Sequence, residues 1–193
     1  RCGTWSAMAH EGVVPDIIAV AKGLAGGYIP LGATVFRRAL GATIIEAHGS
    51  ILTGHTFSGH TAACAAGLAV QRIIERDALL ERVRMRGALL QQEIRAALAR
   101  HAAVGDVRGR GYFIGIELVR DRATKQPFPA ERGLANAINR IAFEDGLIIF
   151  PCAGNAGDGL GDTIIIAPPY NASEAELAEL VDKLERAVAR ALR

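Results

Sequence analysis

The chain has 193 residues with 22 Lys and Arg against 20 Asp and Glu, so its net charge is +2 and nothing predicts the basic surface that nucleic acids require. No apolar run approaches the ~20 residues of a transmembrane helix, and three widely spaced cysteines predict neither a disulfide framework nor a zinc site. We therefore expect a cytoplasmic protein of one or two domains that binds no nucleic acid, membrane or metal.

The first part of the chain predicts two strands and a helix. Residues 16–21 (DIIAVA) and 31–36 (LGATVF) are short apolar runs beside Pro or Gly, as buried strands would be. Residues 59–75 carry small side chains on most faces, which predicts a core helix packed closely on all sides. Thr56 or Ser58 could begin this helix as its N-cap, and Ser58 is the better placed of the two.

The composition changes at Asp77. From Asp77 to about His101, Leu and Ile recur every three or four residues among Arg and Glu, which predicts an amphipathic, solvent-facing helix. Ser173 and Glu176 form a capping box that fixes the start of the last helix. We expect residues 77–193 to form an α+β subdomain that begins with the first of these helices and ends with the second. After the first helix its order is strand, helix, strand, strand, helix, over residues 105–119, 131–146, 147–150, 163–169 and 173–192.

A lysine, Lys22, directly follows the first apolar run, and Gly23, Gly26 and Gly27 follow the lysine. Position alone favours a solvated surface lysine. The glycines, however, let the backbone approach another molecule and leave space beside the ammonium group. A phosphate-binding P-loop is excluded, because the lysine precedes the glycines and no hydroxyl follows it. The remaining chemistry is imine formation, in which a partly desolvated amine attacks an aldehyde such as that of pyridoxal phosphate.

Several blocks of sequence, in a consistent order, resemble the class III aminotransferases of the aspartate aminotransferase superfamily, which has fold type I. Residues 12–35 resemble the family's cofactor-lysine segment, with Asp16 ahead of Lys22 and a glycine pair and a proline after it. Residues 48–69 resemble the segment in which a threonine meets the cofactor phosphate. The opening and the end of the family's C-terminal domain resemble residues 107–119 and 161–188.

The resemblance implies an α/β fold with two parts. Residues 1–76 would be the C-terminal part of the PLP-binding large domain, a mixed and mostly parallel sheet with helices, and residues 77–193 the α+β C-terminal small domain. Family members are more than twice as long, so the family's N-terminal half is expected to be absent. It would carry the aspartate that pairs with the pyridine nitrogen, the aromatic residue stacked on the ring and the first phosphate-binding loop. Asp16 cannot replace that aspartate, because six residues of strand, at ~3.3 Å each, separate it from Lys22.

The resemblance also implies the chemistry. The residue matching Lys22 holds pyridoxal 5′-phosphate as a Schiff base and acts as the proton-transfer base, and the residue matching Thr56 binds the cofactor phosphate of the neighbouring subunit. A homodimer with shared sites would move an amino group from an amine or amino acid donor to a keto-acid acceptor. Two alternatives stay open: an aminomutase or decarboxylase of the same family, and a truncated, inactive module that only folds or dimerises.

Other candidate residues predict structural roles. His55 and His60 lack the Cys or carboxylate neighbours that would complete a metal site. Arg108 and Arg110 could bind a substrate carboxylate, but the glycines beside them favour a tight turn or bulge in which arginine bonds to backbone carbonyls.

The two other lysines and one long loop complete the predictions. Lys125, in a polar loop, and Lys183, on the polar side of the last helix, are expected to be solvated and protonated. Residues 145–170 contain no Arg or Lys, so they cannot supply a guanidinium for a substrate carboxylate. We expect substrates that are amines without a distant carboxylate, or a carboxylate ligand from the missing half.

Overall fold

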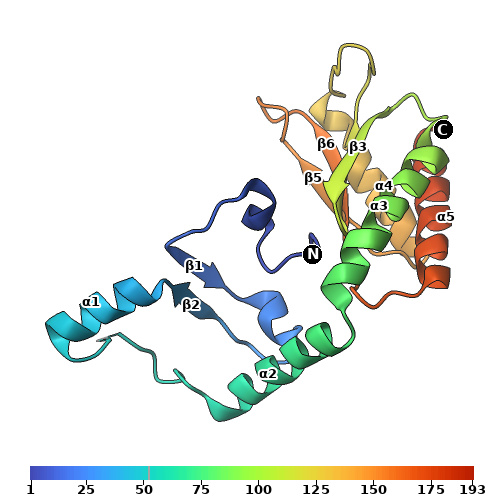
Figure 1. Cartoon of the computed structure of the whole chain (residues 1–193). Coiled ribbons are helices and arrows are strands. Elements are labelled where there is room, and N and C mark those ends of the chain that lie inside the picture. The colour runs from blue at the N-terminus through green and yellow to red at the C-terminus, as the bar shows by residue number, and fades with distance from the viewer. Residues whose placement is uncertain (52) are drawn as a thin grey trace. The chain divides into compact units, whose positions relative to one another are not determined.

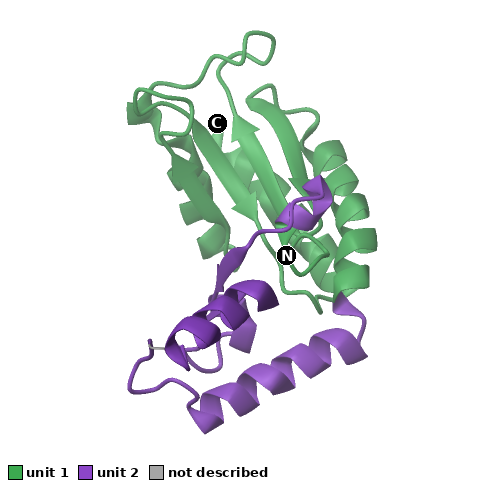
Figure 2. Ribbon diagram, turned by 60° about the vertical axis from the view of Figure 1, so that its left-hand side comes forward, with its two compact units in different colours: residues 1–7, 80–193 green, residues 8–79 purple. Residues whose placement is uncertain are grey.

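The computed structural model describes residues 1–51 and 53–193. These residues form two compact units, one built from residues 1–7 and 80–193 and the other from residues 8–79. Figure 2 colours the two units separately. The mixture of helices and strands confirms the expected α/β class.

The unit of residues 8–79 contains a two-stranded ribbon and two α-helices (Figure 1). The ribbon is antiparallel, with Ile17 opposite Phe36 and Val20 opposite Ala33. The mostly parallel sheet implied by the resemblance is not formed by these strands, because the short segment between them holds no crossover helix of the kind a parallel pair needs. The elements are η1 (Ala7–Glu11), β1 (Ile17–Val20), η2 (Lys22–Ala25), β2 (Ala33–Phe36), α1 (Arg38–His48) and α2 (Thr61–Arg76).

Helix α2 buries one face and exposes the others. Ala63, Gly67 and Ile74 are buried, whereas Leu68 and Ile73 keep 51% and 43% of their surface exposed. The prediction of a core helix packed on all sides is therefore wrong within this chain. Small side chains allow close packing on every face, but only one face meets other described residues.

The second unit is a four-stranded antiparallel sheet with three α-helices. Its strand order is β3-β4-β6-β5. Alternate residues of β4, namely Ile114, Ile116 and Leu118, enter a core that the helices share. The elements are α3 (Leu79–Leu98), β3 (Val104–Arg110), β4 (Phe113–Leu118), η3 (Ala130–Arg132), α4 (Leu134–Glu144), β5 (Phe150–Ala153), β6 (Asp162–Ile166) and α5 (Glu174–Ala191).

The details of this unit refine the sequence prediction. The single strand expected over residues 105–119 is a hairpin, since Arg110 pairs with Phe113 and Gly111, at φ 56°, turns the chain between them. The strand expected at residues 147–150 begins only at Phe150. The capping box at Ser173 is confirmed, with both of its reciprocal bonds present.

Candidate functional site

Lys22 lies at the end of β1 and opens the 3-10 turn η2. Its backbone has φ 50°, a left-handed conformation that costs free energy for a residue with a Cβ atom. The side chain is exposed, and within the described part of the chain no hydrogen bond or ion pair reaches its ammonium group. The amine is therefore available to another molecule.

The glycines beside Lys22 leave the backbone open. A Cβ atom placed on Gly23 or Gly27 would meet nothing within 4 Å, and Gly27 has φ 81°. On the other side of the turn, Ala25 is fully buried. The turn thus has one packed side and one open side, as an approach to a ligand requires.

Asp16 holds the base of the ribbon. Its Oδ1 lies 3.0 Å from Arg37 Nε, and its backbone carbonyl accepts a hydrogen bond of 3.1 Å from Arg37 N. These contacts join the residue before β1 to the residue after β2. They agree with a role for Asp16 in starting the strand.

Thr56 is exposed in a turn that precedes α2. The turn is closed by two reciprocal bonds, from Ser58 N to the His55 carbonyl and from His55 N to Ser58 Oγ, both 2.8 Å. Because its hydroxyl is used in this way, Ser58 does not cap α2, and the prediction of a Ser58 cap is wrong. His60 is the N-cap, and its Nδ1 accepts a hydrogen bond of 3.2 Å from Ala63 N.

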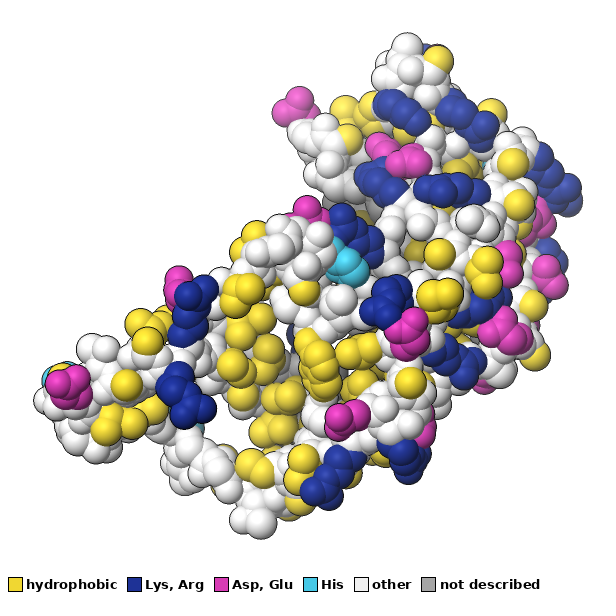
Figure 3. All heavy atoms as spheres, viewed as in Figure 1, with side chains coloured by type: hydrophobic (Ala, Val, Ile, Leu, Met, Phe, Trp, Pro, Cys, Tyr) yellow, Lys and Arg dark blue, Asp and Glu magenta, His cyan; other side chains and the backbone are white. Residues whose placement is uncertain are grey.

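A groove of about 420 Å³ lies beside this turn. One wall follows Lys22 in sequence, at residues 29–32, and the other comes from residues 55–63 around Thr56. Its lining is mostly apolar, with His55, Ser58 and His60 as the polar side chains. Figure 3 shows further apolar side chains gathered over β1, β2 and α2. The arrangement suits a mostly apolar organic molecule with a polar end.

The other two lysines of the sequence have partners. Lys125 Nζ donates a hydrogen bond of 2.6 Å to the Gly105 carbonyl, and Lys183 Nζ lies 2.7 Å from Glu179 Oε1. Among the described residues, Lys22 is thus the lysine whose amine is uncommitted.

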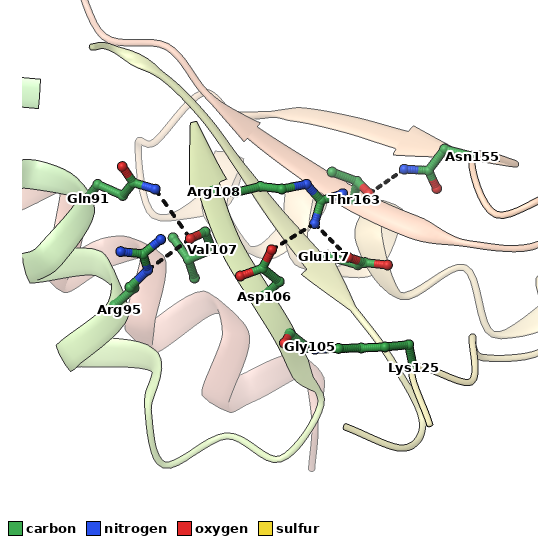
Figure 4. A network of polar contacts seen from close by, with 10 residues as sticks. All are labelled: Gln91, Arg95, Gly105, Asp106, Val107, Arg108, Glu117, Lys125, Asn155 and Thr163. Atoms are coloured by element: carbon green, nitrogen blue, oxygen red, sulfur yellow. Dashed lines mark hydrogen bonds and ion pairs between the residues drawn. The ribbon is translucent and has the colours of Figure 1, made fainter. Parts of the chain in front are cut away.

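Arg108 has a structural role, although not the expected one (Figure 4). Its Nη1 lies 2.6 Å from Glu117 Oε2 and 3.1 Å from Asp106 Oδ2. The hydrogen bond with Glu117, followed by that with Asp106, raises the pKa of Arg108. Arg108 bonds to carboxylates rather than to backbone carbonyls because the sheet register brings all three side chains together. The Val107 carbonyl is instead bound by Arg95 Nε, at 2.9 Å.

Within residues 1–51 and 53–193, no three His, Cys, Asp or Glu side chains are placed to hold a metal ion. The cysteines Cys2, Cys64 and Cys152 are free. In the same described residues, no helix has both the length and the apolar character to cross a bilayer.

The family model described as aminotransferase class-III matches residues 1–188. An aminotransferase of Gibberella zeae is 41% identical over 193 residues, which are 100% of this chain and 38% of that protein. A taurine–pyruvate aminotransferase of Bilophila wadsworthia is 35% identical over 191 residues, covering 97% of this chain and 41% of that protein.

The structure is also similar to a solved amine transaminase from an uncultivated Pseudomonas species in a PLP-bound form. The TM-score is 0.86 and the identity 36%, over 99% of this chain and 42% of that one. The chain therefore spans between 38% and 42% of the length of these three proteins.

Proposed function

Because the chain belongs to the class III aminotransferase family, we propose that it supplies the cofactor-lysine part of a pyridoxal-phosphate-dependent transaminase. The enzyme moves an amino group from an amine or amino acid donor to a keto-acid acceptor. One observation carries the proposal: Lys22, within the matched region, is the lysine without a partner among the described residues, at an open turn beside two glycines.

The residues present fit pyridoxal 5′-phosphate. The open side of the Lys22 turn leaves room for a flat ring, and the exposed Thr56 turn offers a hydroxyl and backbone N–H groups to a phosphate. When bound, the cofactor supplies an aldehyde carbon and a ring that accepts the electrons of the bond being broken. Lys22 would hold the cofactor through Nζ, and once the amino donor had taken its place, the freed amine would take the proton from the donor's α-carbon.

Thr56 binds the phosphate that belongs to the partner subunit's site, so the proposal includes a homodimer with shared sites. The exposed apolar side chains of α2, including Leu68 and Ile73, support such a contact, because they would be covered by a second chain. A cytoplasmic location completes this part of the proposal, in agreement with three free cysteines.

Two domains follow from the same family assignment. We assign residues 1–76 to the PLP-binding large domain and residues 77–193 to the small domain. Since the chain covers at most 42% of the three proteins compared, a second candidate is a truncated module that folds or dimerises without catalysis. An aminomutase or decarboxylase reaction would use the same Lys22.

The substrate is an amine without a distant carboxylate, or one whose carboxylate is bound outside this chain. Residues 145–170 provide no guanidinium or ammonium group. Two relatives support this substrate class, since one acts on taurine, as its name states, and another is an amine transaminase.

Cofactor binding tests the proposal. Wild-type protein mixed with pyridoxal 5′-phosphate should keep a visible absorption band through dialysis, and borohydride reduction should fix the cofactor to the protein. Lys22→Ala should lose both properties, whereas Lys125→Ala should keep them. A band that is equally stable in Lys22→Ala would contradict the proposal, and a wild-type chain without any band would favour the inactive module.

A further inference from the structure

Gln71, on α2, bonds to the turn that carries Lys22. Its Nε2 donates a hydrogen bond of 2.7 Å to the carbonyl of Leu24. Leu24 lies inside η2, two residues beyond Lys22. The bond joins residues 47 positions apart in sequence. It therefore ties the turn to α2, which the short-range bonds within the turn cannot do.

Small residues bring α2 close enough for this bond. A Cβ atom on Gly67 would lie 2.6 Å from Leu31 Cδ2 and 3.9 Å from the Leu24 carbonyl. A Cβ atom on Gly26 would lie 3.3 Å from Val70 Cγ2. The helix therefore packs closely against the C-terminal end of the turn, at Leu24 and Gly26, and Gln71 directly follows Val70 in the helix sequence.

The amide of Gln71 is only half satisfied. Its Oε1 is buried and has no hydrogen-bond partner among the residues that the structure describes. A buried, unpaired carbonyl lowers stability, and methionine would fill a similar volume without that cost. The specific contribution of Gln71 is thus its donor, Nε2.

The turn needs an external support. Lys22 has φ 50°, and such a conformation persists only where the surroundings impose it. The turn's own bonds, from Leu24 N to the Ala21 carbonyl at 3.1 Å and from Gly26 N to the Gly23 carbonyl at 3.2 Å, are the short-range bonds of a 3-10 turn, which have poor geometry.

We propose that Gln71 is a positioning residue for Lys22. By holding the Leu24 carbonyl, it keeps the turn in the conformation that presents the Lys22 amine to the cofactor. Because α2 begins five residues after Thr56, one helix then fixes both the lysine turn and the phosphate-binding turn. This inference rests on the proposed function of Lys22.

The test compares Gln71→Met with wild type in the 193-residue chain. Hydrogen exchange of the Leu24 and Gly26 amides reports the turn, and borohydride trapping of pyridoxal 5′-phosphate is quantified separately at Lys22, Lys125 and Lys183. Loss of one hydrogen bond should speed exchange of both amides about tenfold. The ratio of Lys22 to Lys125 labelling should fall by a similar factor. The melting temperature should change little, because the orphaned Oε1 is removed as well.

Two further variants sharpen the comparison. Gln91 makes the same kind of bond, from Nε2 to the Val107 carbonyl at 3.3 Å in the other unit, so Gln91→Met is a matched control that should leave turn exchange and labelling unchanged. Gln71→Arg keeps an N–H donor, as in the bond from Arg95 to a carbonyl, and should restore both readouts together.

The outcomes separate the two proposals. Equal exchange and equal labelling in wild type and Gln71→Met would overturn the role of Gln71. If Gln71→Met also lowers the melting temperature, Gln71→Arg distinguishes a positioning role from a purely structural one. A Gln71→Arg variant that regains stability but not labelling at Lys22 would also overturn the positioning role of Gln71. Wild-type labelling that does not favour Lys22 over Lys125 would contradict the function proposed for Lys22, and the exchange data would still decide the Gln71 contact.

Discussion

Gly87 is a residue at which α3 lies very close to the β3–β4 turn. A Cβ atom there would lie 2.4 Å from the carbonyl carbon and oxygen of Gly111, backbone atoms that cannot rotate away. We expect Gly87→Ala to lower the free energy of unfolding by about 1–3 kcal/mol, despite the better helix propensity of alanine. Urea unfolding measures the change. Gln92→Ala, at an exposed position on the same helix, should change it by less than about 0.5 kcal/mol, and equal losses in both variants would contradict this account.

At the scale of single residues, local chemistry decides what sequence can predict. Lys22 can be proposed because a strand end and glycines lie directly beside it, whereas the role of Thr56 is implied by the resemblance of residues 48–69 to the family, and both roles stay predictions. His60 is missed because serine is the commoner N-cap, while here Ser58 Oγ is already bonded to His55 N. The bond from Gln71 to Leu24 spans 47 residues, so no local pattern encodes it.

At the scale of elements, Glu185 on α5 joins that helix to the end of α3. His101 Nε2 lies 2.9 Å from its Oε1, and Arg100 is paired with the same oxygen. The hydrogen bond from His101 lowers the pKa of Glu185, against the opposing effect of burial, and Arg100 adds to the lowering. The folded-state pKa is thus below that of the unfolded chain, near 4.3 for an ordinary glutamate. The contact therefore stabilises the fold above about pH 4.3 and is lost as the pH falls through the folded-state pKa.

The melting temperature should report this loss. Between about pH 6 and pH 3 we expect it to fall less steeply in Glu185→Gln than in wild type, because the variant has no carboxylate to protonate there. Glu131→Gln, at an exposed position in the same unit, should follow the wild-type curve. If the melting temperatures of Glu185→Gln and wild type fall in parallel with pH, the contact of Glu185 with His101 and Arg100 does not contribute to the pH dependence of stability.

The helices with clear hydrophobic periodicity are predicted well. The two elements that are missed, α1 and the β3–β4 hairpin, lack such a clear signal in their residues. Helix α3 and the capped start of α5 agree with their predicted positions. Helix α1 has no counterpart in the prediction, since Gly41 and the β-branched run Thr43, Ile44 and Ile45 are weak helix formers. The β3–β4 hairpin reads as one strand because its turn, Gly111–Tyr112, holds a tyrosine that is fully buried.

At the scale of the whole molecule, the proposed shared site predicts complementation between subunits. In the complete enzyme, a mixture of Lys22→Ala and Thr56→Ala subunits forms heterodimers in which one composite centre has an intact lysine and an intact threonine. Part of the activity should return on mixing, relative to either variant alone. If both residues serve the cofactor of their own chain, each subunit keeps one defect and mixing restores nothing.

The most direct test of the central claim is to find which lysine bonds to pyridoxal 5′-phosphate. The sequence has three lysines, at positions 22, 125 and 183, so peptide mapping after borohydride reduction gives an unambiguous answer. We predict that the pyridoxyl label is on Lys22, since Lys125 and Lys183 are held by the Gly105 carbonyl and by Glu179. A label concentrated on Lys125 or Lys183, with Lys22 unmodified, would contradict the proposed function.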